Sequence, residues 1–184
     1  MIWYARLLIG LVVMGFLLSG CGTIYKAAKD ERNVGTQIKD EQITMAIRKK
    51  FVNDELVKYF DISTYCYKGD VYLVGEYKKM NQKQRAVALA KEVEGVRSVT
   101  PHFLPEKKGD LCGTTDNVLI ATKVKTKLIG DKEIESTNIE VKTLQCHVIL
   151  LGLVDETREI NKAIKHAKSV EGVRSVTSYL KILK

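Results

Sequence analysis

The sequence predicts an α+β protein that contains one small domain twice, each copy with the element order α-β-β-α-β. The main observation is a repeated phrase, because VEGVRSVT stands at residues 93–100 and again at 170–177. The 77-residue offset between the two phrases continues backwards without a gap over about 60 residues. A match of that length indicates a duplicated domain, at 40–104 and 116–184, joined by a linker over 105–115.

Each copy opens with an amphipathic helix that is followed by a strand. In both helices the apolar residues recur every four positions, which is the spacing of a helix with one buried face. These residues are Ile43, Ile47 and Phe51 in the first copy, and Ile120, Val124 and Leu128 in the second. Residues 62–67 then alternate between two kinds of side chain, which predicts a half-buried strand.

The next element of each copy is a hairpin. Lys68-Gly69 predicts a two-residue turn into a second strand at 70–75, because glycine supplies the positive φ that tight hairpins need. In the second copy Cys146 replaces this glycine. The second hairpin is therefore expected to have a different type of turn, or a strained one.

A second helix and a third strand complete each copy. The helices are expected at 81–93 and 156–170, with Asn81 and Asp155 as N-caps. Gly95 stands where a helix ends in the left-handed conformation, and a strand follows it. The repeated phrase is thus a helix stop and a strand entry. Each copy has two helices on one face of a three-stranded mixed sheet.

The N-terminal residues do not belong to this fold. Arg6 precedes an apolar run over 7–18, which is too short to span a bilayer and is followed by Leu-Ser-Gly-Cys at 18–21. This pattern predicts a lipoprotein signal peptide over 1–20 and lipid attachment at Cys21. Residues 21–39 would form a tether, whose fully extended length is up to about 60 Å.

The formal net charge is +8 and the sequence pI is about 9.2. A basic chain suggests a polyanionic partner, but an exported and lipid-anchored protein does not meet nucleic acid. In that compartment the polyanions are anionic phospholipid headgroups, lipopolysaccharide and cell-wall polymers. We therefore expect no nucleic-acid partner.

Three cysteines remain after Cys21, so at least one of them is unpaired. Cys66 lies among the core positions of its strand, which predicts a buried thiol. For Cys112 and Cys146 a disulfide is one interpretation, but free thiols are favoured.

The residues of the chain do not form a pattern typical of an enzyme. His102, His147 and His166 lack the spacing of zinc ligands, and neighbours such as Cys146 and His147 point to opposite faces of a strand. There is also no phosphate-binding loop and no nucleophile elbow. We expect neither catalysis nor a metal or cofactor.

Several stretches together resemble a known family. The lipobox, the duplication, and the phrases DERNVGTQI (30–38), IATKV (120–124) and LLGLVDETRE (150–159) are similar to the dual BON-domain lipoproteins of Gram-negative bacteria. The resemblance implies two BON domains and a non-enzymatic role in outer-membrane integrity. It also implies a location on the inner leaflet of the outer membrane, with the domains in the periplasm. The implied partner is anionic phospholipid, phosphatidylglycerol or cardiolipin, bound through the first helix of the second BON domain.

That helix, expected over 117–129, differs in charge from its counterpart in the first copy. Leu119, Lys123 and Lys127 are four residues apart and form one stripe, and Lys125 adds a charge on another exposed face. No acidic residue occurs between positions 117 and 130. The matching stripe of the first copy is Gln42, Ala46 and Lys50. These four residues, Leu119, Lys123, Lys125 and Lys127, are the predicted lipid-binding residues, although Leu119 stands where the family has an aromatic anchor.

Two other functions fit the sequence. One is a protein-interaction scaffold, for instance for the outer-membrane barrel assembly machinery, with Tyr65, Tyr67 and Tyr77 as an exposed contact patch. The same tyrosines are also ordinary residues for a sheet surface. The other is a peptidoglycan-binding module, since basic periplasmic domains meet this polymer.

Overall fold

The computed structural model describes residues 34–57, 61–107 and 109–183. The expected signal peptide, the lipid attachment at Cys21 and the tether as far as residue 33 lie outside the described residues. Residues 32–184 form one compact unit, and the description below concerns this unit.

The two copies have the same elements in the same order. The first consists of α3 (Val34–Val52), β1 (Ile62–Tyr67), β2 (Asp70–Tyr77), α4 (Met80–Lys91) and β3 (Ser98–Pro105). The second consists of α5 (Thr114–Ile129), the short 3-10 helix η1 (Ser136–Asn138), β4 (Ile139–Leu144), β5 (His147–Val154), α6 (Thr157–Lys168) and β6 (Ser175–Ile182). In each three-stranded sheet the central strand pairs antiparallel with the first and parallel with the last, so the sheets are mixed, as predicted.

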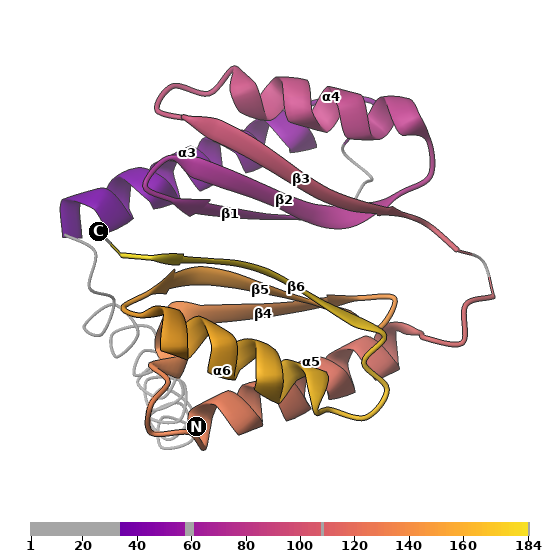
Figure 1. The fold of residues 1–184 in the computed structure, drawn as a ribbon. Coiled ribbons are helices and arrows are strands. Elements are labelled where there is room, and N and C mark those ends of the chain that lie inside the picture. The colour runs from indigo at the N-terminus through magenta and orange to yellow at the C-terminus, as the bar shows by residue number, and fades with distance from the viewer. Residues whose placement is uncertain (1–33, 58–60, 108, 184) are drawn as a thin grey trace, which may run out of the picture. The chain divides into compact units, whose positions relative to one another are not determined.

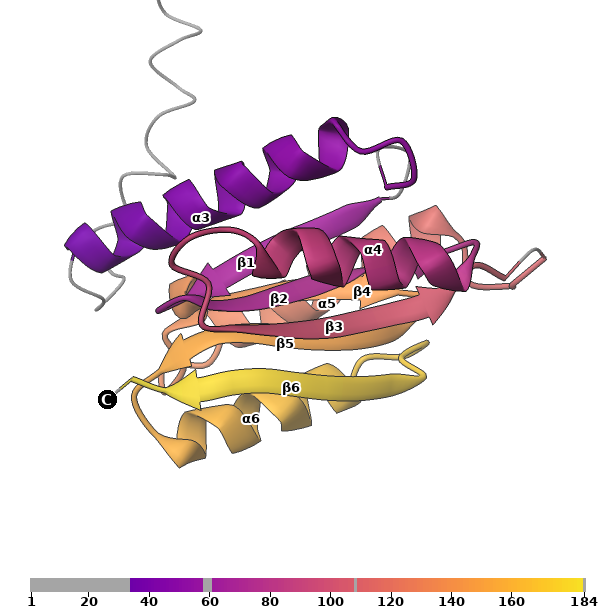
Figure 2. The same cartoon turned by 90° about the horizontal axis from the view of Figure 1, so that it is seen from above.

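Each sheet has one face covered by its own two helices. Figure 1 shows α3 and α4 over the first sheet and α5 and α6 over the second, and Figure 2 shows α3 and α4 above the strands of the first sheet. Ile47 and Leu73 are fully buried in the first helix-sheet core, and Val124 and Leu150 in the second. The residues predicted to face the core from the first helix of each copy do so.

The other faces of the two sheets pack against each other. Tyr72 and Val74 of β2 lie in one buried cluster with Leu144, Ile149 and Leu151. Because β2 and β5 are apolar on both faces, each is covered twice, once by helices and once by the other sheet. The result is a four-layer arrangement of helices, sheet, sheet and helices.

The three tyrosines that were expected to form an exposed patch are partly buried. Tyr65 and Tyr67 are half-buried and pack against the cluster between the sheets. Tyr77 packs against the core of the first copy, with the Lys83 ammonium 5.9 Å from the centre of its ring. The idea that these three tyrosines form an exposed contact patch is therefore wrong.

The hairpin turns of the two copies are of the same type, so the expectation of a different turn type is wrong, whereas the alternative expectation of a strained turn is confirmed. Lys68 and Gly69 have φ of 54° and 80°, and Gln145 and Cys146 have φ of 48° and 60°. Positive φ at both central residues is the requirement of a type I′ turn. The turn type is thus conserved, and Cys146 adopts a backbone conformation that is costly for a residue with a side chain.

The helix boundaries differ from the prediction at their N-termini. Helix α3 begins at Val34, so residues 34–39 are helical and do not belong to a tether. The predicted N-caps Asn81 and Asp155 are also wrong. The side chain of Gln82 instead reaches back and accepts the N–H groups of Lys78 and Lys79, at 3.0 and 3.1 Å. At their C-terminal ends the repeated glycines behave as predicted, since Gly95 has a φ of +87°.

Candidate functional site

Helix α5 is held against the second sheet by its apolar face. Ile120, Val124 and Leu128 are buried there, and each stands 77 residues after its counterpart in α3. At the N-terminus, Asp116 accepts the N–H of Gly113 at 2.9 Å, which satisfies one donor and places a negative charge at the positive end of the helix dipole. The helix is therefore fixed in position, and its opposite face is open to solvent.

The predicted lipid-binding residues all lie on that open face. Lys123, Lys125 and Lys127 are exposed, and Leu119 is 53% exposed. The face points away from the seam between the sheets, because α5 covers the outer side of its sheet (Figure 1). A basic stripe hidden between the two copies would have been incompatible with a bilayer contact, and this arrangement is not what the structure shows.

The lysines of α5 are not equivalent. The Lys125 ammonium lies 3.4 Å from a carboxylate oxygen of Glu140, so part of its charge is neutralised. Among the residues that the structure describes, Lys123 and Lys127 have no acidic partner. The free positive charge of the helix is therefore concentrated on Lys123 and Lys127.

Comparison with the first copy shows why Lys127 is free. Its counterpart Lys50 donates to Glu92 at 2.8 Å. The residue that matches Glu92 in the second copy is Ser169, whose hydroxyl donates to the carbonyl of His166 at 2.8 Å. The second copy thus kept the lysine and lost the carboxylate that neutralises it.

The same position has a different shape in the first copy. A groove of about 800 Å³ runs between α3 and the turn that follows α4, and Gln42, Ala46 and Lys50 line it. These are the counterparts of Leu119, Lys123 and Lys127. Ala46 is replaced by the larger Lys123, and Lys50 corresponds to Lys127, so positions that line a groove in the first copy form a basic stripe in the second.

Two apolar residues of α5 belong to the open face but were not predicted. Val118 and Ile129 are 60% and 71% exposed. They are eleven residues apart, which at about 100° per residue places them almost in line along the helix. This spacing was the signal in the sequence that could have identified them.

The threonines between them have hydroxyls that are hydrogen-bonded within the helix. Thr122 donates its hydroxyl to the carbonyl of Val118 at 2.9 Å, and Thr126 donates to the carbonyl of Thr122 at 3.0 Å. Around the helix, the apolar and threonine residues form a strip with Lys125 on one side and Lys123 and Lys127 on the other. We call this strip with its lysines the α5 surface; it consists of Val118, Leu119, Thr122, Lys123, Lys125, Thr126, Lys127 and Ile129.

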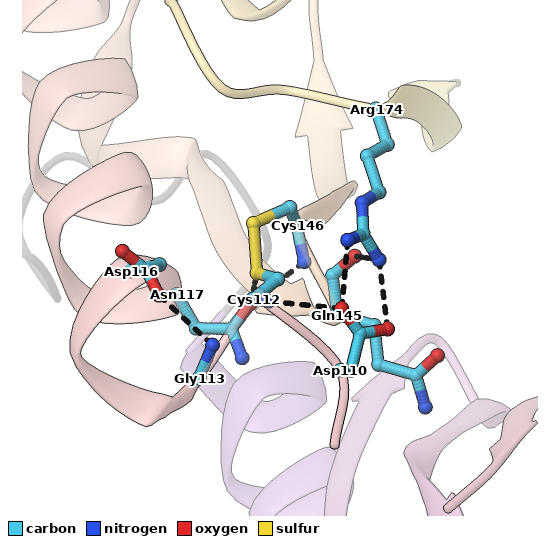
Figure 3. The surroundings of a disulfide bond; sticks show 8 residues. All are labelled: Asp110, Cys112, Gly113, Asp116, Asn117, Gln145, Cys146 and Arg174. Carbon is cyan, nitrogen blue, oxygen red and sulfur yellow. Dashed lines mark hydrogen bonds and ion pairs between the residues drawn. A yellow bond between two sulfur atoms is a disulfide. The ribbon is translucent and has the colours of Figure 1, made fainter. Parts of the chain in front are cut away.

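A disulfide fixes the segment that precedes α5. Cys112 and Cys146 are bonded, with their Cα atoms 5.8 Å apart, so the interpretation of free thiols is wrong for this pair (Figure 3). Asn117 accepts the N–H of Cys146 at 2.9 Å. The bond ties the start of the helix to the turn between β4 and β5. Cys66 is buried and is not part of a disulfide, as predicted.

The cysteines replace two glycines of the first copy. Gly35 and Gly69 stand 77 residues before Cys112 and Cys146. In the second copy a covalent bond joins the two positions that these glycines occupy in the first. Helix α5 begins at Thr114, three residues later in the repeat than α3, which begins at Val34.

An ion pair reinforces the same segment. The guanidinium of Arg174 donates to both carboxylate oxygens of Asp110, at 2.7 and 2.8 Å (Figure 3). These hydrogen bonds, with a further one from the backbone N–H of Cys112, hold the pKa of Asp110 well below its ordinary value. The two hydrogen bonds from Arg174 connect this part of the linker to the second domain.

The histidines have structural partners. His166 lies 2.8 Å from a carboxylate oxygen of Asp131, and His147 lies 2.7 Å from the hydroxyl of Ser175. In the described ranges no group of three or more histidine, cysteine, aspartate or glutamate side chains is placed to hold a metal ion. Over the same ranges no helix is both long enough and apolar enough to cross a membrane.

Comparison with known proteins agrees with this architecture. A family model of the BON domain matches residues 39–104 and 116–184, which are most of the chain and contain one α-β-β-α-β copy each. The protein belongs to the BON-domain family and carries two such domains.

Among curated proteins the chain is 32% identical to osmotically-inducible protein Y of Escherichia coli over 158 residues, covering 85% of this chain and 79% of that protein. It is 30% identical to the outer membrane lipoprotein DolP of Haemophilus influenzae over 168 residues, covering 91% of this chain and 86% of that protein. It is 28% identical to a 21 kDa hemolysin of Actinobacillus pleuropneumoniae over 148 residues, covering 80% and 76% of the two chains.

Proposed function

We propose that this protein is an outer-membrane lipoprotein that is anchored through Cys21 and docks on anionic phospholipid through the α5 surface. Its role would be to support the integrity of the outer membrane, without catalysis, from the periplasmic side of the inner leaflet. The similarity to a relative named as an outer membrane lipoprotein supports the location. The observation that carries the lipid contact is the pair of exposed, unneutralised ammoniums of Lys123 and Lys127 beside an exposed apolar strip.

The chemistry of the α5 surface suits a headgroup region. Val118, Leu119 and Ile129 can enter the boundary between headgroups and acyl chains, while the lysines at the edges of the strip meet phosphates. The threonine hydroxyls are already bonded within the helix, so their desolvation costs little. Anionic lipid is favoured over zwitterionic lipid because the strip has lysines on both sides.

The expected strength is that of a weak, salt-sensitive contact. Each lysine near an anionic surface contributes about 1 kcal/mol, which decays within a Debye length of about 8–10 Å. Two free lysines and one partly neutralised lysine therefore cannot hold the protein on a membrane by themselves. Stable attachment would come from the acyl chains at Cys21, since two or more chains hold stably. The α5 surface would orient the domains.

A flotation experiment tests this proposal. The mature chain with Cys21→Ser, which has no acyl chain, is mixed with phosphatidylcholine vesicles that contain or lack phosphatidylglycerol or cardiolipin. We expect flotation with the anionic vesicles alone, and its loss in the Lys123→Glu/Lys127→Glu variant. Purified cell-wall sacculi in a parallel sedimentation test the alternative of peptidoglycan binding.

The matched control carries the same change of charge on the opposite layer of the molecule. Lys39 and Lys49 of α3 are exposed and have no acidic partner in the part of the chain that the structure describes. The Lys39→Glu/Lys49→Glu variant should float as well as the parent protein. Undiminished flotation of the α5 variant at moderate salt, or an equal loss in both variants, would contradict the assignment to α5.

A further inference from the structure

The outer face of α3 carries a row of exposed apolar side chains. Val34, Ile38, Met45 and Val52 are 68%, 54%, 54% and 69% exposed. They point away from the buried face formed by Ile43, Ile47 and Phe51. Single exposed apolar residues are ordinary, but these four lie almost in line along one helix, with Glu41, Gln42, Arg48 and Lys49 between them. We call the four apolar residues the α3 outer row.

The row has one apolar position in each heptad. Ile38, Met45 and Val52 are separated by seven residues each, whereas the second seam position of a coiled coil is occupied here by the polar residues Glu41 and Arg48. The row runs the length of the helix, about 27 Å at 1.5 Å per residue. A helix partner can therefore cover it end to end.

A membrane that contacts α5 cannot also contact the α3 outer row of the same molecule. Helix α3 lies on the outer side of the first sheet and α5 on the outer side of the second, and the two sheets pack face to face between them. When the α5 surface lies on a membrane, the α3 outer row faces away from that membrane. Any partner of the row is therefore separate from the membrane that α5 would contact.

We infer that the α3 outer row pairs with the same row of a second copy of this chain, antiparallel and centred on Met45. In that register Ile38 lies opposite Val52 of the partner subunit, and Met45 lies opposite Met45 of the partner subunit. The flexible methionine at the axis adapts to its own image, which a branched side chain does less well. A two-fold pairing of this kind needs a self-complementary surface, and this row is one.

The charges beside the row fit the same register. Glu41 and Arg48 are exposed and seven residues apart, so they lie on the same side of the row, and the Arg48 guanidinium also donates to the carbonyl of Thr64 at 3.3 Å. Glu41 stands four residues before Met45 and Arg48 stands three residues after it. In the antiparallel pair, Glu41 therefore lies level with Arg48 of the partner subunit, on the same side of the seam. A parallel pair would instead place Arg48 of the partner subunit about 10 Å further along the axis and on the other side of the seam, so the two opposite charges would not meet.

The contact is small, so its strength depends on how the copies are confined. An interface built on one helix face falls below the roughly 1,200 Å² of total buried area that specific, stable complexes reach. Copies held at one membrane surface have a high effective concentration, which compensates for weak affinity. If the proposed function of α5 holds, pairing and docking compete, because the α5 surfaces of a pair point in opposite directions and cannot both lie on one flat bilayer.

Cysteine cross-linking of the full, lipidated chain in membranes tests the pairing and its register. Met45→Cys is expected to form a disulfide-linked dimer. Ile38→Cys alone is expected not to, because the two copies of this position lie about 21 Å apart in the antiparallel register. Co-expression of the Ile38→Cys and Val52→Cys chains should give a mixed dimer. The parent chain, whose Cys66 is buried, gives the background.

Met80→Cys on α4 serves as the matched control for random collision, because Met80 is 54% exposed, as Met45 is, and belongs neither to the α3 outer row nor to the α5 surface. Cross-linking of Met80→Cys as strong as that of Met45→Cys would overturn the inference. Absence of cross-linking at Met45→Cys would do the same. Self-cross-linking of Ile38→Cys and Val52→Cys at the level of Met45→Cys would show a parallel pair and overturn the antiparallel register.

A charge swap gives a second readout that does not depend on the position of the new cysteine. In the Met45→Cys chain, Glu41→Arg or Arg48→Glu alone should reduce dimer formation several-fold. The combination of both should restore it. Residues 41 and 48 are about 10 Å apart within one helix, so a restoration arises between two chains and not within one. Failure of the double variant to recover would contradict the Glu41–Arg48 contact.

Discussion

His102 of the first domain and Tyr179 of the second meet across the seam, with 3.0 Å between the imidazole Nδ1 and the phenol oxygen. Tyr179 is also the residue that stands 77 positions after His102, so equivalent positions of the two copies contact each other. Val74 and Leu151, which are likewise 77 residues apart, share the buried cluster between the sheets. The two copies therefore face each other about an approximate two-fold axis that passes close to this pair.

The position of His102 predicts a dependence of stability on pH. Burial between the sheets lowers the pKa of His102 below its ordinary value of 6.5. As the pH falls below about 6.5, His102 becomes protonated in the unfolded chain but stays neutral in the folded protein. The free energy of unfolding therefore decreases until the pH falls below the pKa of His102 in the folded protein. Thermal unfolding at pH 7.5 and 5.5 should show this loss, and His102→Asn should reduce it. A His102→Asn variant with the unchanged pH dependence would contradict the assignment.

The disulfide predicts a large and reversible effect of reductant on stability. Cross-linking residues separated by 34 positions removes entropy from the unfolded chain worth about 3–4 kcal/mol. Urea unfolding with and without dithiothreitol should show a loss of this order. Under reducing conditions Cys146→Gly should be about 1 kcal/mol more stable than the parent protein, because glycine adopts a φ of 60° without strain. No gain from this variant would show that the turn is unstrained.

Removal of the buried carboxylate of Asp40 is expected to lower the free energy of unfolding strongly. Its oxygens accept the N–H groups of Lys68 and Gly69 at 2.8 and 2.9 Å, and the residue is 4% exposed. Asp40→Ala leaves two donors of the turn without this acceptor, so we expect a loss of about 2–4 kcal/mol in the free energy of unfolding. Asp40→Asn, which copies Asn117 of the second domain, should lose less than half of that. Equal losses in the two variants, measured by urea unfolding, would refute the role of the acceptor.

Replacement of Leu119 by tryptophan is expected to strengthen the binding to anionic vesicles. Leucine lacks the amphipathic ring that suits the depth of the headgroups, and tryptophan has it. In the chain with Cys21→Ser, Leu119→Trp should increase the affinity for vesicles containing phosphatidylglycerol several-fold, with little change for phosphatidylcholine alone. The control is Met45→Trp on the opposite layer, which should not change the affinity. The increase is measured as the lipid concentration at half-maximal flotation.

The duplication allowed most of the fold to be predicted, because two copies with the same pattern confirm each other. The helices, the hairpins and the strand after Gly95 all follow from spacing within one repeat. The N-caps of the second helix in each copy could not be predicted from this spacing. The groups that cap these helices are Gln82 and Glu159, which stand within the first turn and reach back, whereas polar residues nearer the start attract the prediction.

The packing of the two domains against each other was harder to predict from the sequence. Residues 71–74 are all apolar, which is the pattern of a strand covered on both faces, but a sequence does not say what covers the second face. For this reason Tyr65 and Tyr67 were placed in solvent. The disulfide was missed because spacing along the chain does not report distance in space. Its signal was the replacement of Gly35 and Gly69 together.

The lysines of the site were predictable as exposed residues, since the core positions of α5 fix its outer face. What the sequence did not reveal is which of them is free. Lys127 is free because position 169 is a serine where the first copy has Glu92, and Lys125 is partly neutralised by Glu140, a residue of another element. Both facts depend on contacts between elements.

The most direct measurement of the central claim is the depth of spin labels on the two outer layers of the protein. The lipidated chain, labelled at Leu119→Cys or at Met45→Cys, is reconstituted sparsely in vesicles with and without phosphatidylglycerol, and the access of oxygen and of a water-soluble nickel complex is compared. With the anionic lipid, the label at position 119 should become accessible to oxygen and protected from nickel, while the label at position 45 stays in water. A label at position 119 that remains in water in anionic vesicles, or one at position 45 that becomes buried, would show that α5 is not the face that meets the membrane.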